Sequence, residues 1–219
     1  RRKVRRETEM VRKTKEEAGK TRKDIIDAAR RVFHECGVSR SSLDKIAKEA
    51  GVTRGAVYWH FEDKAELFFA MREDVFAPLI ERTDALLFSA ELSDPLDAIE
   101  ASVREFFRVL EDCSVVREVF EIMISRCEYV DEFSSVQDEI GRPAQTFLAK
   151  IERVYQLAAA KGTMRANLDP LVAARDTWAF TSGILHLLLS CQKGTDLSLH
   201  VPAMISAHIA LRRKGAGPA

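Results

Sequence analysis

The residues of this chain best suited to binding chemistry lie within RSSLDKIAKEAGVTRGAVYWHFEDK, residues 40–64. Arg54 offers a fork of hydrogen-bond donors, and Gly55 beside it lets the backbone approach another surface closely. Tyr58 and Trp59 are adjacent, and neighbouring helix positions point about 100° apart, so one short helix cannot bury both rings. Exposed amphipathic rings beside small residues and an arginine are typical of a surface that meets nucleic acid.

Three short helices are expected to position these residues. Apolar residues recur at three- and four-residue spacing over residues 16–36, which predicts a first helix with one buried face. Ser41 or Ser42 would cap a second helix, and Thr53 would cap a third in which the apolar side chains face inward. The pattern is that of a helix-turn-helix domain over residues 16–63.

The rest of the chain also has helical periodicity, and nothing in it resembles a strand. Asp63 with Glu66 three residues later predicts the start of a fourth helix, which Pro78 would kink. Further helices are expected near residues 94–112, 114–129, 133–162, 169–192 and 199–213. We therefore predict an all-α fold of about nine helices, with a second domain over residues 64–214, a flexible basic arm over residues 1–15 and a disordered tail over residues 215–219.

Charge is divided unevenly although the net charge is zero. Residues 1–64 hold 18 Lys/Arg against 11 Asp/Glu, whereas the remainder holds 16 against 23. A basic front and an acidic body are expected when only the front meets phosphates, and chance clustering on a charged surface is the alternative.

Composition and spacing exclude several classes of protein. No apolar run has transmembrane length and no signal peptide opens the chain, so we expect a soluble cytoplasmic protein. Cys36, Cys113, Cys127 and Cys191 form no Cys-x-x-Cys pair and are expected to be reduced and mostly buried. The histidines are scattered, and the chain has neither a Gly-rich phosphate loop nor a nucleophile elbow. We therefore expect that the protein is not an enzyme and that it has no metal site and no cofactor.

The stretch from Ser41-Ser42-Leu43 through Tyr58-Trp59-His60-Phe61 to Lys64 and Leu67 resembles the TetR family of bacterial transcriptional repressors. About 25 residues match the family signature at matching spacing, so the resemblance is far more specific than that of a generic helix-turn-helix. VRKTKEEAGKTR near the start and Ser125-Arg126-Cys127-Glu128-Tyr129 in the body also resemble one subgroup, the local repressors of multidrug efflux pumps.

The resemblance implies a homodimer whose N-terminal heads bind a palindromic operator in double-stranded DNA. Arg54 and Gly55 would then approach base edges, with Ala56 and Trp59 flanking them. Phosphates would be contacted by Thr53, Tyr58, His60 and Lys64, and by Ser42 at the start of the second helix. Physical chemistry supports two of these roles independently, because an arginine fork fits guanine and a capping hydroxyl lies where a helix N-terminus favours phosphate.

The body is expected to hold a small hydrophobic or amphipathic effector. By resemblance, Val103, Phe106, Phe120, Ile124, Phe147, Trp178, Thr181 and Ser182 would line the cavity. Phe120 and Ile124 stand where related repressors often carry polar residues, which indicates a more apolar pocket. Ser102 and Ser125 are further polar candidates, and a filled apolar core is the alternative for the aromatic residues.

The helices near residues 169–192 and 199–213 are too apolar for one buried face each, so we expect them to pair with the same helices of a second subunit. The expected function is a ligand-responsive repressor, and the alternative is a DNA-binding activator or architectural protein without a small-molecule ligand. Neither requires a membrane.

Overall fold

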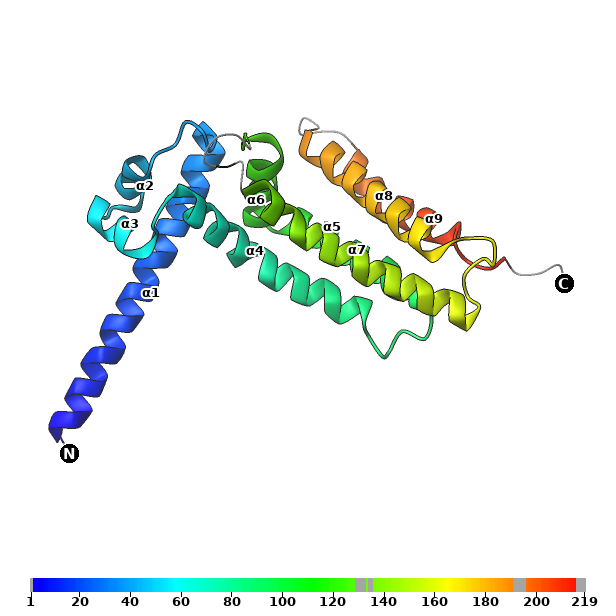
Figure 1. Ribbon diagram of the computed structural model, residues 1–219, viewed down its shortest axis with the longest axis horizontal. Helices are drawn as coiled ribbons and strands as arrows, with labels where there is room; N and C mark the ends of the chain where they lie inside the picture. The colour runs from blue at the N-terminus through cyan, green and yellow to red at the C-terminus, as the bar shows by residue number, and fades with distance from the viewer. Residues whose placement is uncertain (1, 129–132, 134–135, 191–195, 216–219) are drawn as a thin grey trace. The chain divides into compact units, whose positions relative to one another are not determined.

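The computed structural model describes the backbone of residues 2–128, 133, 136–190 and 196–215, and the side chains of residues 16–128, 133, 139, 141–190 and 196–215. Over these residues the fold is all-α, as predicted, with nine helices and a single isolated β-bridge (Figure 1). The helices are α1 Arg2–Cys36, α2 Leu43–Ala50, α3 Arg54–His60, α4 Lys64–Leu87, α5 Pro95–Asp112, α6 Ser114–Ser125, α7 Val136–Lys161, α8 Pro170–Ser190 and α9 Leu197–Ala210.

Capping side chains explain where several helices begin. Ser42 Oγ and Thr53 Oγ1 each accept a hydrogen bond from the backbone N–H three residues later, at 3.2 and 3.1 Å. Asp63 Oδ1 accepts from the backbone N–H of Glu66 at 2.8 Å, as a capping box requires. The reciprocal bond is shifted by one residue, because the Glu66 carboxylate accepts from Glu62 N rather than from Asp63 N.

Two predicted boundaries differ from the structure by four residues or more. The first helix begins at Arg2 rather than near Glu16, because residues 2–15 are mostly Arg, Lys and Glu, which favour helices, and contain no Pro or Gly. The mobility expected of this arm stays a prediction. The sixth helix ends at Ser125 rather than near residue 129. The backbone bends at Arg126, whose carbonyl oxygen accepts a hydrogen bond from Val38 N at 2.9 Å.

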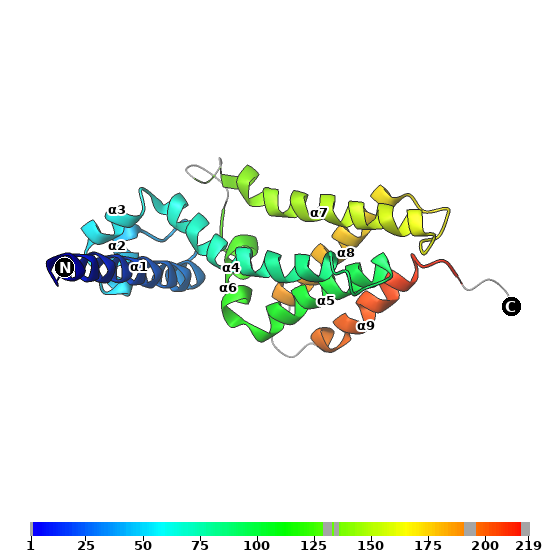
Figure 2. The same ribbon diagram turned by 90° about the horizontal axis from the view of Figure 1, so that it is seen from below.

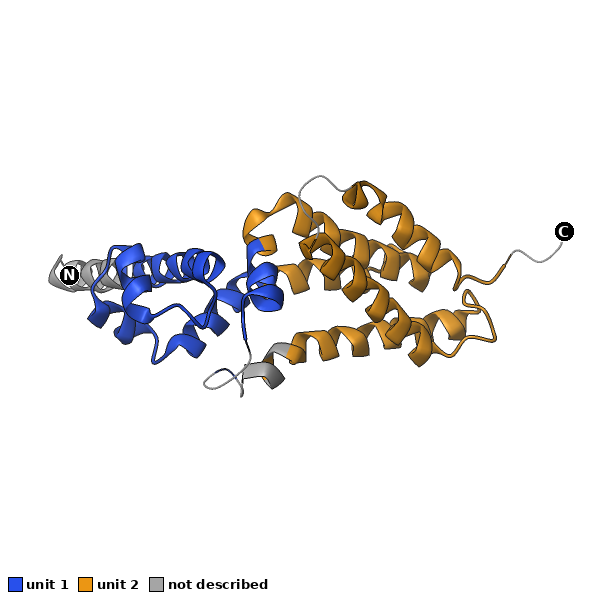
Figure 3. Cartoon of the chain, turned by 90° about the horizontal axis from the view of Figure 1, so that it is seen from above, with its two compact units in different colours: residues 1–75, 118–133 blue, residues 76–117, 134–219 orange. Residues whose placement is uncertain are grey.

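The chain forms two compact units (Figure 3), one of residues 1–75 and 118–133 and the other of residues 76–117 and 134–219. In the first unit the small helices pack on α1 around fully buried Phe33, Val57 and Phe61. Arg30 pairs with Glu118, so the second half of α6 belongs to this unit. The unit therefore has a core of its own that fixes the orientation of α3.

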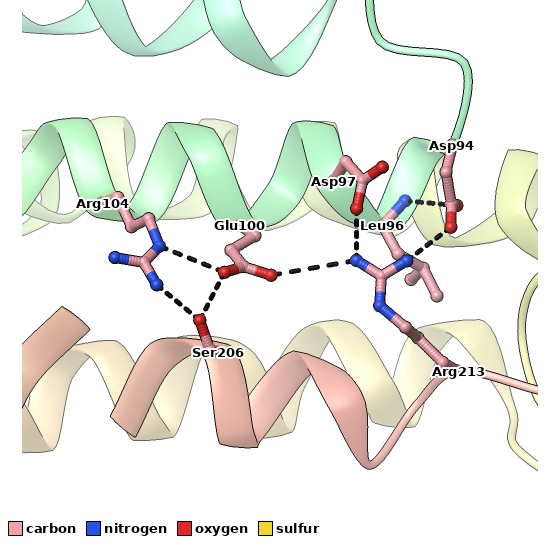
Figure 4. Close-up of polar contacts among 7 residues, drawn as sticks. All are labelled: Asp94, Leu96, Asp97, Glu100, Arg104, Ser206 and Arg213. Atoms are coloured by element: carbon pink, nitrogen blue, oxygen red, sulfur yellow. Dashed lines mark hydrogen bonds and ion pairs between the residues drawn. The ribbon is translucent and has the colours of Figure 1, made fainter. Parts of the chain in front are cut away.

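In the second unit α5 and α8 each contact both α7 and α9. Figure 2 shows α5 beside α9. Tyr155 on α7 is fully buried, and its hydroxyl lies 2.7 Å from Thr177 Oγ1 on α8. Charged residues tie α5 to the end of α9 (Figure 4): Arg213 pairs with Asp94 and Asp97 at the start of α5. These contacts hold the four helices as one bundle.

Candidate nucleic-acid interface and effector domain

The third helix divides its aromatic residues between the core and the surface. Val57 and Phe61 are buried, with 0% and 1% of their surface exposed, whereas Tyr58 and Trp59 are 46% and 73% exposed. A large aromatic ring left in water is unusual in a well-packed small domain and marks a surface that contacts something else. The adjacency of the two rings in the sequence predicts that they cannot both be buried, and the structure places both outside.

Small residues at the start of α3 leave its backbone accessible. Gly55 is exposed, and a Cβ added there would have one neighbour within 4 Å, Thr53 Oγ1 at 3.9 Å. Ala56 next to it is half-buried. The turn that leads into α3 depends on Gly51, whose φ of +69° lies in the left-handed region that a side chain disfavours. This end of α3 can therefore approach another surface closely.

The guanidinium of Arg54 is exposed, but contacts with two neighbouring side chains fix its position. Its Nε lies 3.1 Å from Asp44 Oδ1, and its Nη2 donates to the hydroxyl of Tyr58 at 3.3 Å. These contacts, the hydrogen bond with Tyr58 first and the charge of Asp44 second, raise the pKa of Arg54 above its ordinary value. The fork is therefore fully charged and held at two of its nitrogen atoms.

Lys64 has a structural role that the sequence did not reveal. Its half-buried Nζ donates to the carbonyl oxygens of Val38 at 3.2 Å and Ser41 at 3.5 Å, in the turn between α1 and α2. The same turn uses the buried Ser41 hydroxyl, which donates to Val38 O, and leaves Ser42 as the helix cap. A lysine at position 64 therefore stabilises the head from within, in addition to the phosphate contact predicted for it.

His60 lies at the edge of the same surface. Its ring packs edge-on against Trp59, with ring centroids 4.5 Å apart. Partial burial, and to a lesser extent the positive charge of Arg22, lowers the pKa of His60 below its ordinary value. A phosphate contact from this residue near neutral pH would thus come from a neutral N–H rather than from a cation.

The predicted effector residues are divided between the two units. Phe120 and Ile124 lie on α6 in the first unit, and the other six lie in the second. Within the second unit Phe147 and Trp178 face each other edge to face, with ring centroids 6.1 Å apart. Of the remainder, Val103 and Thr181 are buried, whereas Phe106 and Ser182 are half-buried.

A cavity of about 490 Å³ lies elsewhere in the second unit, among α5, α8, α9 and the first turn of α6. Its volume falls in the range of small-molecule pockets. None of the eight predicted effector residues lines it. Its wall is apolar with several charged groups, from Ala101, Arg104, Glu105, Phe107, Arg108, Leu110, Glu111, Arg117, Leu188, Ser198, Val201, Pro202 and Ile205.

Both predicted dimerisation helices expose apolar side chains. Leu187 on α8 is 52% exposed, and Leu199 on α9 is 75% exposed. On α9 the exposed face continues through Ala203 and Ala207 at four-residue spacing, a stripe of small residues that allows close helix packing.

Comparison with known families identifies the chain. Residues 25–71 match the model of bacterial regulatory proteins of the tetR family, and residues 94–213 match the C-terminal region of MAATS-type transcriptional repressors. The chain belongs to the TetR family. It is a helix-turn-helix transcriptional regulator, and α2 and α3 are the helices of that motif.

Relatives of this TetR-family regulator match along most of its length. It is 34% identical to the transcriptional repressor BepR of Brucella suis, over 91% of this chain and 95% of the relative. The crystal structure of NalD, the secondary repressor of the MexAB-OprM multidrug efflux pump in Pseudomonas aeruginosa, superposes with a TM-score of 0.81 at 30% identity, covering 92% of this chain and all of NalD. A complex of Stenotrophomonas maltophilia SmeT with triclosan gives 0.77 at 30% identity, covering 91% and 97%.

Other features expected of this TetR-family chain concern metals, membranes and thiols. Over the described residues, no three metal-binding side chains cluster and no helix has the length and hydropathy of a membrane span. Cys36, Cys113 and Cys127 are half-buried rather than mostly buried, because each lies at or just beyond a helix end. Cys191 lies outside the described residues.

Two functional contacts of this regulator escaped the sequence analysis. Asp44, which pairs with Arg54, and the carbonyl oxygens that hold Lys64 come from other elements of the head. Neither pair has a helical i, i+4 spacing. Asp44 is one of four acidic residues within residues 40–64, so its charge alone did not distinguish it.

Proposed function

We propose that the protein is a homodimeric, ligand-responsive repressor of a multidrug efflux operon, that it acts in the cytoplasm and that it catalyses no reaction. The observation that carries the proposal is the exposed surface of α3, where Tyr58 and Trp59 lie outward beside Arg54. The relatives support the target, since NalD is described as a repressor of a multidrug efflux pump.

On DNA, α3 would lie in the major groove. Arg54 and Gly55 would approach base edges, with Ala56 and Trp59 beside them, because a guanidinium fork fits guanine and a residue without a side chain allows close approach. Phosphates would be held by Ser42, Thr53, Tyr58, His60 and Lys64. A dimer would place two such helices about 34–36 Å apart, one turn of DNA, which makes the operator palindromic.

The effector would be a hydrophobic or amphipathic small molecule bound in the second unit, which holds Val103, Phe106, Phe147, Trp178, Thr181 and Ser182. Contacts from Phe120 and Ile124, which the family resemblance also implies, stay a prediction. The hydroxyl of Ser102, which precedes Val103 on α5, supports a polar group on the effector. Its Oγ is buried and has no hydrogen-bond partner among the described residues. Leaving such a group unpaired is unfavourable, and a ligand atom would relieve that cost. The complex of SmeT with triclosan supports an effector of this class.

Effector binding would release DNA through a difference in affinity between two conformations. A ligand shifts such an equilibrium only as far as it binds one state better than the other, and by linkage DNA must weaken ligand binding by the same factor. α4 runs into both units and contains Pro78, which makes it a suitable element to change shape.

The operator experiment uses the duplex that the full-length protein enriches from a random pool. Fluorescence anisotropy would measure its affinity for this duplex, with a shuffled duplex as control, in the presence of triclosan and of uncharged, cationic and anionic amphipathic compounds. We expect tight binding of the selected duplex and release by at least one compound. Equal binding of both duplexes would contradict DNA recognition, and retention of DNA with every compound would favour a regulator without a small-molecule ligand.

The dimer has a separate test. Ala207 lies on the exposed face of α9, so Ala207→Glu would place a charge within the proposed four-helix interface. We expect sedimentation to show a monomer for this variant and a dimer for Leu157→Glu, which alters an exposed leucine of α7. A dimer in both cases would move the interface away from α9.

A further inference from the structure

Asp44 holds the side chain that α3 would use to recognise DNA. It lies in the first turn of α2, and its Oδ1 is 3.1 Å from the Nε of Arg54. On the other side, the Tyr58 hydroxyl accepts a hydrogen bond from Nη2, and the guanidinium carbon lies 5.3 Å from the centroid of the Tyr58 ring. The ion pair, the hydrogen bond and the cation–π contact therefore restrict a long side chain that is otherwise surrounded by solvent.

These two contacts leave part of the guanidinium of Arg54 available to donate hydrogen bonds. Asp44 lies beside Nε as the opposite charge of an ion pair, and the Tyr58 hydroxyl accepts one hydrogen of Nη2. Among the described residues no partner accepts from Nη1. The end of the guanidinium formed by Nη1 and Nη2 is thus left to donate, and it matches the two acceptors, O6 and N7, that guanine presents in the major groove.

A carboxylate at this position is unfavourable for raw affinity. The residues around it are expected to face phosphates, and each added negative charge opposes binding to any DNA sequence. An acid in the first turn of a helix also favours that helix slightly, but this effect is the same wherever the side chain points. Stabilisation of the helix N-terminus therefore does not explain why the Asp44 carboxylate lies beside Arg54.

We propose that Asp44 is a specificity-determining positioning residue, which orients Arg54 toward one base pair of each half-site at the expense of affinity for all DNA. The proposal rests on the function proposed for α3 as the DNA-reading helix. An ordered side chain loses less conformational freedom on binding, and its benefit is restricted to the base that its geometry fits. Asp44 therefore lowers the affinity for non-specific DNA and increases the ratio of specific to non-specific affinity.

The chain offers a matched control on the same helix. Glu49 also lies on α2 and is also exposed, but it pairs with Arg31 of α1 at 2.7 Å and does not contact Arg54. Asp44→Ala and Glu49→Ala each remove one negative charge from α2. A difference between the two variants therefore reports the contact with Arg54 rather than the change of charge.

The experiment selects preferred sequences from a random duplex pool with the full-length wild type, Asp44→Ala, Glu49→Ala, Arg54→Ala and the double variant of Asp44 and Arg54. Affinities for the wild-type consensus, for its single-base variants and for a shuffled duplex are then measured at several salt concentrations. Thermal melting checks that each variant is folded. If Asp44→Ala does not fold, Asp44→Asn, which keeps the shape and one acceptor, replaces it, and a smaller loss at the same base pair is expected.

We expect both single-charge variants to bind the shuffled duplex more tightly than the wild type, by a similar factor. Asp44→Ala alone should lose discrimination, by roughly fivefold or more, at the base pair that Arg54→Ala also affects. In the Arg54→Ala background, removal of Asp44 should change that discrimination no further.

Unchanged discrimination in Asp44→Ala would overturn the proposal, and so would an equal loss with and without Arg54. Either result would leave the proposed function intact, because the wild type would still select a sequence. If the wild type itself enriches no sequence, the DNA-reading function of α3 is wrong and the role of Asp44 fails with it.

Discussion

The imidazole of His208 on α9 stacks flat against the ring of Phe180 on α8, with centroids 3.9 Å apart and 11° between the planes. Its Nε2 lies 3.1 Å from Thr177 Oγ1. Burial, followed by the positive charge of Arg212, lowers the pKa of His208 to about 4, whereas the opposite charge of Asp176 has a smaller effect. A protonated ring is therefore disfavoured where α8 and α9 meet.

This contact predicts a loss of stability in acid. Because the folded pKa of about 4 lies below the ordinary 6.5, the unfolded chain binds more protons between these values. The contribution of His208 is fully present above pH 6.5 and is lost as the pH falls toward 4. We expect His208→Gln to flatten the pH dependence of the urea midpoint in this window, and His200→Gln, on the exposed side of α9, to leave it unchanged. Equal slopes for wild type and His208→Gln would contradict the assignment.

The two faces of α3 predict opposite consequences for neighbouring aromatic residues. Trp59→Ala removes a ring that is 73% exposed, so the free energy of unfolding should change by less than about 0.5 kcal/mol while operator affinity falls. Phe61→Ala empties a buried site and should destabilise the head by about 3–5 kcal/mol. Urea unfolding and operator titration of both variants test the division. A Trp59→Ala protein with full operator affinity would remove this ring from the interface.

Lys64 should affect folding as well as DNA binding. In Lys64→Ala the carbonyl oxygens of Val38 and Ser41 lose a charged donor, which should lower the free energy of unfolding by about 1–2 kcal/mol. If its ammonium also meets a phosphate, affinity falls for all sequences alike, and the slope of log affinity against log salt decreases by about one. Lys48→Ala, at an exposed position of α2, is the control for stability. Unchanged stability in Lys64→Ala would show that the turn does not depend on this lysine.

The effector site can be located with a pair of substitutions in the second unit. Trp178→Ala removes a predicted contact beside Phe147 and should weaken effector-induced release of DNA by roughly tenfold or more. Ala101→Trp fills the cavity among α5, α8 and α9 and should leave release unchanged. Titration of the DNA complex with triclosan measures both. The reverse pattern would place the effector in the cavity and remove the predicted set from contact with it.

Local signals predicted much of the fold. Ser42, Thr53 and Asp63 mark helix starts because a capping hydrogen bond spans three residues and is determined by nearby sequence. Helical geometry predicted that Tyr58 and Trp59 cannot both be buried, and in the structure both are exposed. The start of α1 was missed because the unbroken run of charged residues before Glu16 lacks an apolar stripe but still favours a helix.

Contacts between elements could not be predicted in the same way. Arg54 meets Asp44 across the turn between α2 and α3, and Lys64 reaches a turn before α2. Such pairs depend on how helices pack, and their sequence spacing has no characteristic period. The cavity is a further example, since its lining comes from four helices and none of it coincides with the residues suggested by family resemblance.

The backbone hydrogen bond from Val38 N to Arg126 O has a practical consequence for anyone who wants the DNA-binding part alone. A fragment of residues 1–75 alone would lack Arg126. It would also lack Glu118 and Glu121, the acidic partners of Arg30 and His34. The turn before α2 would lose its acceptor, His34 would lose Glu121, and Arg30 would keep only the more distant Asp27 at 3.9 Å. The head is a discontinuous unit of residues 1–75 and 118–133, so a peptide that ends at residue 75 should be far less stable than the same residues within the whole polypeptide.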